Sequence, residues 1–137
     1  MGRIASIDLG KKRVGVAVSD PLRMIAQPLA TLRFVSMEKL IRDVLTIVRE
    51  KEIDLILVGL PVRDDGREGE GAAMSRSFKA RLEREGVSCL LRDESFSSRE
   101  AEDVIHEHGK HRREHREQID QIAAAVVLRE FLKERQD

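Results

Sequence analysis

A short, continuously apolar run at residues 54–58 (Asp-Leu-Ile-Leu-Val) limits the possible folds of this chain more than any other segment. Strands covered on both faces have this composition, and such strands occur in parallel sheets that are packed between helices. The residues before the run predict one of those helices, capped by Ser36 and ending near Glu52, because their apolar positions share one helical face. The run therefore predicts a central strand of an α/β fold.

The first part of the chain predicts an antiparallel meander. Strand-like segments at 3–9 and 14–18 flank a turn at 10–13, which is a hairpin pattern, and a third strand is expected within 26–34. After the central run we expect a surface loop at 63–71, a helix from about 72 to 84, a strand at 87–91, a helix from the capping box at 97–100 to 108, and a final helix after the charged run 110–117. This order predicts one domain over residues 1–137, in which the meander continues into parallel strands with helices on the faces.

The composition excludes several classes of protein. The 25 basic and 25 acidic residues give a formal net charge of zero, which argues against a histone-like or single-strand-coating protein. Four phenylalanines are the only aromatic residues, so base stacking is a poor basis for a mechanism. The longest apolar run, 122–128, is far shorter than the ~20 residues that span a bilayer. No signal peptide is recognisable and Cys89 is the only cysteine, so we expect a cytoplasmic protein with no membrane partner.

Acidic residues stand at three places where a core would favour apolar ones. Asp8 interrupts the apolar run 4–9, Asp120 lies on an otherwise apolar helical face, and Asp93 with Glu94 closes the fifth strand. An unpaired buried charge costs several kcal/mol, so such acids must pair with a base, cap a backbone or bind a metal. These acids are therefore the first candidates for a functional site.

Two of these places also have a simple structural explanation. Asp120 fits a first-turn acid favoured by the helix dipole, and an acid at the strand end fits an ion pair with Arg92 or Arg99. Asp8 is harder to explain in this way, because in the expected hairpin residue 8 lies opposite residue 15 and residue 6 opposite residue 17. The face around Asp8 then carries only small side chains, on which a ligand would have room. They are Ser6, Gly15 and Ala17.

A family resemblance is carried by motifs that follow one another along the whole chain. They are 7–10 (Ile-Asp-Leu-Gly), 13–20 (Arg-Val-Gly-Val-Ala-Val-Ser-Asp), 26–29 (Ala-Gln-Pro-Leu), 58–61 (Val-Gly-Leu-Pro) with 65–66 (Asp-Gly), 93–101 (Asp-Glu-Ser-Phe-Ser-Ser-Arg-Glu-Ala) and 119–125 (Ile-Asp-Gln-Ile-Ala-Ala-Ala). Together they resemble the YqgF family, also called RuvX. The resemblance implies a ribonuclease H-like α/β fold, with a five-stranded mixed sheet in the order 3-2-1-4-5 and helices on both faces. It also implies a nuclease, a hydrolase acting on ester bonds, that is similar to RuvC-type Holliday junction resolvases and acts in 5′-end processing of the precursor of 16S ribosomal RNA.

The acidic site of that family falls on Asp8, Glu94 and Asp120, which the resemblance makes catalytic residues and metal ligands. In the implied strand order the fifth strand lies about 10 Å from the first. The longer Glu94 is therefore preferred to Asp93, and Gly59 on the intervening strand leaves space for its reach. The neighbours expected to support the site without binding the metal are Asp93, Ser6 and Gly59. A carboxylate cluster without His or Cys selects Mg²⁺ or Mn²⁺.

Basic residues around these acids are expected to bind the phosphate backbone of the substrate. They are Lys11, Lys12, Arg13, Arg92, Arg99, Lys110, Arg112, Arg113 and Arg116. The family usually has Arg-Leu after its Asp-Glu pair, where this chain has Ser95 and Phe96, so Arg92 and Arg99 are the candidates to replace that contact. The expected partner is precursor ribosomal RNA, with branched DNA and ribosomal precursor particles as alternatives, and the chain is expected to be a monomer or a homodimer.

Other functions remain open from the sequence. His111, Glu114 and His115 satisfy the H-x-x-E-H spacing of inverzincin metalloproteases, but they lie in a charged run that is typical of a solvent-exposed segment. Residues 8–10 resemble the first phosphate loop of actin-like kinases and ATPases, which bind ATP between two such domains. A Holliday junction resolvase acting on four-way DNA, or a catalytically idle module that binds RNA or protein, would also be compatible with this fold.

Overall fold

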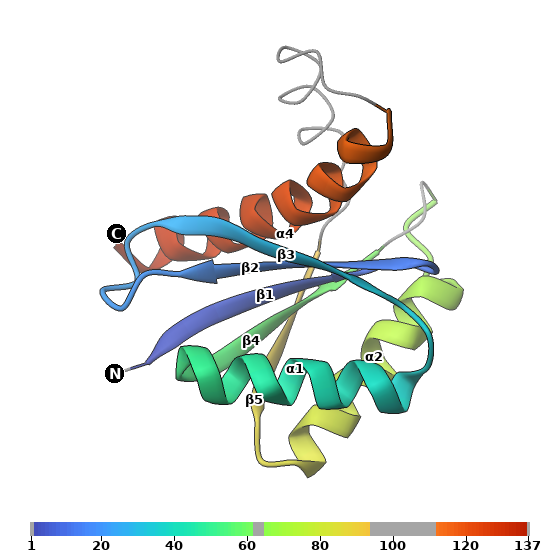
Figure 1. Cartoon of the computed structure of the whole chain (residues 1–137), viewed down its shortest axis with the longest axis horizontal. Helices are drawn as coiled ribbons and strands as arrows, with labels where there is room; N and C mark the ends of the chain where they lie inside the picture. Colours follow the sequence, from blue (N-terminus) through green and yellow to red (C-terminus); the bar gives the residue numbers. More distant parts are fainter. Residues whose placement is uncertain (1, 62–64, 94–111, 137) are drawn as a thin grey trace.

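The computed structural model describes residues 2–61, 65–93 and 112–136, and in these residues one five-stranded sheet has helices on both faces (Figure 1). The strands are β1 (Arg3–Leu9), β2 (Arg13–Ser19), β3 (Ala26–Arg33), β4 (Ile53–Leu60) and β5 (Ser88–Asp93), and the helices are α1 (Met37–Lys51), α2 (Glu70–Arg84) and α4 (Arg112–Gln136). The sheet order β3-β2-β1-β4-β5 confirms the expected order. The first three strands form an antiparallel meander, and β4 and β5 continue it as parallel strands beside β1.

Each face of the sheet has its own hydrophobic core. Figure 1 shows α1 and α2 on one side of the sheet, where Phe78 of α2 is fully buried, and α4 on the other side. Leu128 of α4 packs in the second core with Ile4 of β1 and Ala17 of β2. Because side chains alternate between the faces of a strand, Asp8 lies on the same face as Ile4, under α4.

The predicted central strand and the helix before it are confirmed. Ser36 caps α1, because its Oγ accepts a hydrogen bond from the backbone N–H of Lys39 at 3.2 Å. Glu52 ends the helix in the left-handed conformation, with φ of 53°, and β4 begins at the next residue. Leu57 of β4 is buried in the α4 core, whereas its neighbours Ile56 and Val58 are buried against α1 and α2. The apolar run is therefore covered on both faces, as predicted.

Some element boundaries differ from the sequence-based prediction. β5 reaches Asp93, past the predicted end at residue 91, and α2 begins at Glu70 instead of residue 72. The largest difference is the start of α4 at Arg112, because much of the charged run expected before the last helix belongs to the helix itself. Arg, Glu and Gln favour helix, and a turn that extends past the core needs no apolar face. The helix predicted at 97–108 lies outside the described residues.

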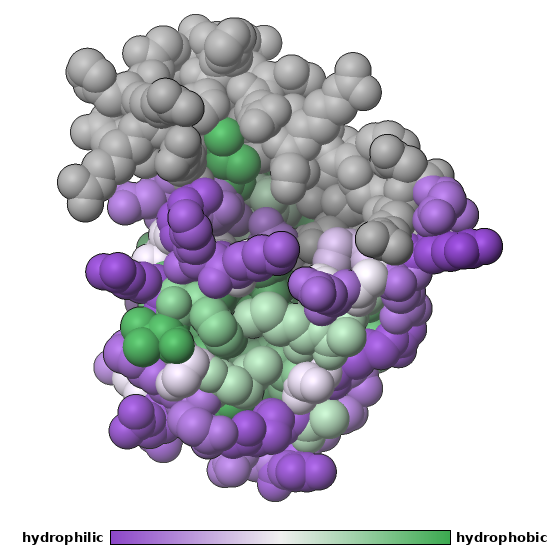
Figure 2. Space-filling view, turned by 90° about the vertical axis from the view of Figure 1, so that its right-hand side faces the viewer, coloured by the Kyte–Doolittle hydropathy of each residue, from purple (hydrophilic) through white to green (hydrophobic). Residues whose placement is uncertain are grey.

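Part of the apolar surface remains open at one end of the molecule. Figure 2 shows apolar residues between hydrophilic ones on the side that lies at the right of Figure 1. Partly buried hydrophobic residues around the first core include Phe34, Met37 and Met74.

In the described part of the chain, no helix is both long and apolar enough to cross a membrane.

Candidate active site

Gly15 brings two of the predicted acids to the same place. Asp8 is paired with Gly15 across the hairpin, in the register that the sequence predicts. A Cβ atom on Gly15 would lie only 1.9 Å from the carbonyl oxygen of Asp120 and 3.0 Å from its Cβ, so the backbone of α4 rests directly on this glycine. Paired residues of antiparallel strands have Cα atoms about 4.5–5.5 Å apart. Asp8 and Asp120 therefore flank one glycine on the α4 face of the sheet.

The small side chains around Asp8 make room for α4. Ala17 is fully buried in the core that contains Ala124 and Leu128 of α4, and the backbone of α4 occupies the space over Gly15. The expectation that these two small residues leave space for a ligand is therefore wrong. Ser6 lies on the same face and is 1% exposed, and its Oγ has no hydrogen-bond partner among the described residues.

Arg13 neutralises Asp120 in this structure. Its Nε donates a hydrogen bond to Oδ2 of Asp120 at 2.7 Å, and the carboxylate side chain is 18% exposed. Burial raises the pKa of Asp120 above its ordinary value, Arg13 lowers it in part, and the charge of Glu117 raises it further. Asp120 lies eight residues after the first residue of α4, so the helix-dipole explanation is wrong. Burial and the charge of Glu117 together therefore outweigh the effect of Arg13 on the pKa of this carboxyl.

Strand β5 places Asp93 and Arg92 on opposite faces of the sheet. Cys89 and Leu91 belong to the core under α1 and α2, whereas Arg92 lies over the ring of Phe131 in α4, 5.3 Å from its centroid. Alternation along the strand therefore puts Asp93 on the α1 and α2 face, away from Asp8. The next residue, Glu94, lies outside the described residues.

Gly59, predicted to leave space for the reach of Glu94, is paired with Arg92 in the sheet. Its carbonyl oxygen accepts a hydrogen bond from the buried Ser75 Oγ at 2.8 Å. This bond ties the end of β4 to α2, on the face away from α4. Gly59 therefore lies where β4 is held to α2, and it is the neighbour in the sheet of Arg92, whose side chain faces α4.

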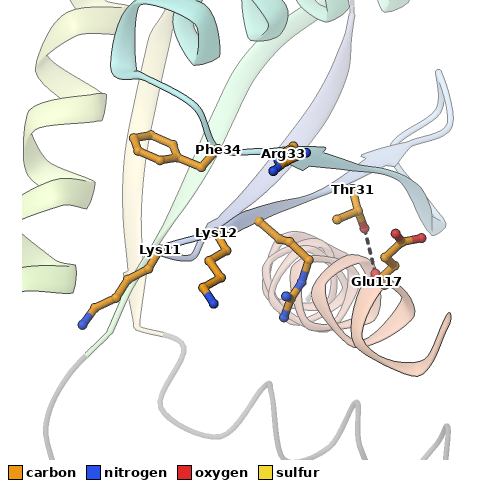
Figure 3. A pocket seen from close by; sticks show the side chains of 7 residues that line it. Lys11, Lys12, Thr31, Arg33, Phe34 and Glu117 are labelled. Atoms are coloured by element: carbon orange, nitrogen blue, oxygen red, sulfur yellow. Dashed lines mark hydrogen bonds between the residues drawn. The ribbon is translucent and has the colours of Figure 1, made fainter. Parts of the chain in front are cut away.

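A basic groove lies beside the two acids. It has a volume of about 620 Å³ and is lined by Lys11, Lys12, Arg13, Thr31, Arg33, Phe34 and Glu117. Figure 3 shows Lys11 and Lys12 extending from the hairpin turn on the side of α4. The sequence predicted the three basic residues of the turn but missed Arg33. The available signal was strand register, because Arg33 is paired with Arg13.

The other predicted phosphate-binding residues are not among the described side chains that line this groove. Arg92 forms an ion pair with Glu134 and packs on Phe131, and both contacts tie it to the far part of α4. Arg99 and Lys110 lie outside the described residues. Three more lie in the first turns of α4, where only the backbone is described. They are Arg112, Arg113 and Arg116.

The described residues contain no group of three or more His, Cys, Asp or Glu side chains that could hold a metal ion. Asp8 and Asp120, two of the three predicted ligands, are described, and the third, Glu94, lies outside the described residues. The protease-like spacing cannot be assembled from described side chains either, since His111 is outside and His115 is described only as backbone in α4.

Comparison with solved structures identifies the fold. The fold is similar to Thermus thermophilus RuvC in complex with a Holliday junction substrate, with a TM-score of 0.59 and 14% identity, covering 99% of this chain and 96% of that one. It is equally similar to a fowlpox virus resolvase in complex with Holliday junction DNA, with a TM-score of 0.59 and 15% identity, covering 98% and 99% of the two chains. At such low identity the likeness concerns the fold, which is the predicted ribonuclease H-like fold.

Sequence comparison then identifies the family. The RuvX family, whose model is described as Holliday junction resolvase, matches residues 2–134, and the chain belongs to this family. A relative from Chlorobaculum tepidum is 42% identical over 135 residues, covering 95% of this chain and 92% of its own, and one from Roseiflexus sp. (strain RS-1) is 33% identical over 132 residues, covering 96% and 94%. Both bear the name "Putative pre-16S rRNA nuclease". The predicted family is confirmed, and the predicted nuclease class agrees with these names.

Proposed function

We propose that this chain is a metal-dependent nuclease that hydrolyses phosphodiester bonds in precursor 16S ribosomal RNA, with Asp8, Glu94 and Asp120 as its catalytic residues. The observation that carries the proposal is the contact between α4 and Gly15, because this glycine touches Asp120 and is also paired with Asp8. Two carboxylates on one face of a strand and its covering helix are costly in a core and useful in a metal site. The family and the names of the relatives support the nuclease class and the RNA substrate.

The described acids fit a hard divalent cation. In this structure the positive group beside Asp120 is the guanidinium of Arg13. Burial raises the pKa of the Asp120 carboxyl although its ion pair with Arg13 lowers it. Glu94 is the better candidate for the third ligand, since Asp93 lies on the other face of the sheet from Asp8. Oxygen ligands favour Mg²⁺ or Mn²⁺. Such an ion, when bound, would lower the pKa of a water molecule and offset the charge that develops on the phosphate.

The basic residues would hold the substrate. Lys11 and Lys12 on the exposed turn attract the flanking phosphates as point charges. Arg13 has a planar fork that matches either a carboxylate or a phosphate, so it would exchange Asp120 for a substrate phosphate when the acids bind metal. With few aromatic residues at hand, backbone and shape would determine binding more than base sequence. The cytoplasm, and ribosomal precursor particles within it, would be the place of action.

A direct comparison of two substrates tests the proposal. The purified protein would be incubated with a precursor 16S RNA fragment and, separately, with a four-way DNA junction, each with Mg²⁺, with Mn²⁺ and with EDTA. We expect cleavage of the RNA with either ion and none with EDTA. Cleavage of the junction at symmetric positions, with the RNA left intact, would favour resolvase activity, the second candidate suggested by the description of the family. Cleavage that persists in EDTA would refute metal dependence.

A further inference from the structure

The basic groove beside the acids is built on β3 as much as on the hairpin turn. Arg33 is paired with Arg13, and Thr31 is paired with Gly15, the glycine that contacts α4. Paired residues share a face of the sheet, so Thr31 and Arg33 follow the same face as Asp8. The groove thus starts next to the two acids and runs outward along β3.

Hydrogen bonds fix the walls of the groove in the described structure. Thr31 Oγ1 donates to the carbonyl oxygen of Glu117 at 2.7 Å (Figure 3). The same hydroxyl accepts from Gln121 Nε2 at 3.1 Å, and both bonds join β3 to α4. The N–H of Phe34 donates to the carbonyl oxygen of Lys12 at 2.8 Å, which joins the end of β3 to the hairpin turn. The basic residues of the groove are therefore presented on a rigid frame, which reduces the entropy lost on binding.

The positive charge of the groove is not balanced within the described part of the chain. Four of the seven lining residues are basic and one, Glu117, is acidic. Lys11, Lys12 and Arg33 form no ion pair with any described residue, in contrast to Arg81 on α2, which pairs with Glu38. Like charges that converge on a groove of this size favour a ligand with several regularly spaced negative charges.

We infer that one strand of the substrate backbone runs from the two acids through this groove, and that Arg33 is a phosphate-binding residue. This inference rests on the proposed function and adds the path of the substrate to it. A hollow of about 620 Å³ between a hairpin and a helix accommodates one sugar-phosphate strand. Arg33 contacts the backbone and not a base edge, so its contribution does not depend on base sequence.

Binding measured without cleavage tests the path separately from catalysis. The affinity of a labelled single-stranded RNA oligonucleotide would be measured in EDTA over a range of salt concentrations, for the wild type and for Arg33→Glu, Arg33→Gln and Arg84→Glu. Arg84 is a matched control, because it is an exposed basic residue at the end of α2, in the layer that covers the other face of the sheet.

We expect Arg33→Glu to weaken binding about tenfold and to reduce the slope of log K against log salt by about 1, because one phosphate contact is lost. Arg33→Gln should show a smaller loss in the same direction, and Arg84→Glu should bind like the wild type. Equal affinity and slope for the wild type, Arg33→Glu and Arg84→Glu would overturn the path, and would leave the catalytic proposal in place.

Neutral methylphosphonate linkages, placed one at a time in the same oligonucleotide, provide a second measurement. If Arg33 binds one phosphate, one such linkage weakens wild-type binding and has little further effect on Arg33→Gln, because both changes remove the same contact. Additive losses at every linkage would overturn the assignment of Arg33. This readout remains valid even if Arg33→Glu lowers stability, because it compares substrates on one folded variant.

Discussion

Replacing Gly15 with alanine tests how the fold positions the acids. The new Cβ would lie 1.9 Å from the carbonyl oxygen of Asp120, whereas ordinary contacts begin at 3.4 Å, so α4 would have to move by about 1.5 Å at that point. Leu128, a core residue eight positions further along α4, is fully buried and resists the movement. Overpacking of this kind costs roughly 1–3 kcal/mol. A misplacement of about 1 Å between catalytic groups lowers the rate about 10²-fold.

The assay combines urea unfolding with RNA cleavage under conditions in which the variant is folded. Gly86→Ala is the matched control, because Gly86 has φ of +86° and a Cβ added there would meet no described atom within 4 Å. It should lose about 1 kcal/mol through backbone strain alone and keep its activity. We expect both variants to be less stable and only Gly15→Ala to be inactive. Wild-type cleavage by folded Gly15→Ala would refute the role of this contact.

Three further predictions concern charge and burial. Arg13→Gln should bind Mn²⁺ several-fold more tightly in calorimetry, because the ion no longer displaces a guanidinium from Asp120; weaker binding would contradict this competition. Burial raises the pKa of Cys89 to about 12, so iodoacetamide at mildly alkaline pH should modify it only after unfolding, and rapid modification of the folded protein would be inconsistent with that burial. Backbone N–H groups, chiefly that of Ile25, hold the pKa of Asp20 below its ordinary value, so the charged form stabilises the fold at neutral pH and this stabilisation is lost as the pH falls through the lowered pKa. The difference in Tm between the wild type and Asp20→Ala should therefore shrink in acid, and a constant difference would argue against it.

Local rules predicted the features that depend on neighbouring strands. The loop length of the hairpin fixed the pairing of Asp8 with Gly15, and the continuously apolar run correctly indicated a strand covered on both faces. The same register, extended to β3, would have placed Arg33 beside Arg13. Arg33 was missed because it is distant from the acids in sequence and comes near them only through the pairing of strands.

Features that depend on how α4 crosses the sheet could not be predicted from the sequence by such local rules. Arg13 and Asp120 are 107 residues apart, and only the packed helix brings them together. A stripe of small residues has the same appearance in sequence whether it faces a ligand or a helix, which explains the wrong interpretation of Gly15 and Ala17. The start of α4 was placed too late because a charged run gives no apolar periodicity to follow.

Cleavage of precursor 16S RNA by Asp8→Asn is the most direct test of the central claim. This claim is that Asp8 and Asp120, the acids that flank Gly15, belong to a catalytic metal site. The amide is nearly isosteric and removes one metal-binding oxygen, so the variant should keep its Tm and lose detectable cleavage at saturating Mn²⁺. Asp43→Asn, on the surface of α1 where Asp43 pairs with Lys39, controls for the loss of one carboxylate and should cleave like the wild type. Wild-type turnover by Asp8→Asn, in preparations free of contaminating nuclease, would contradict the account.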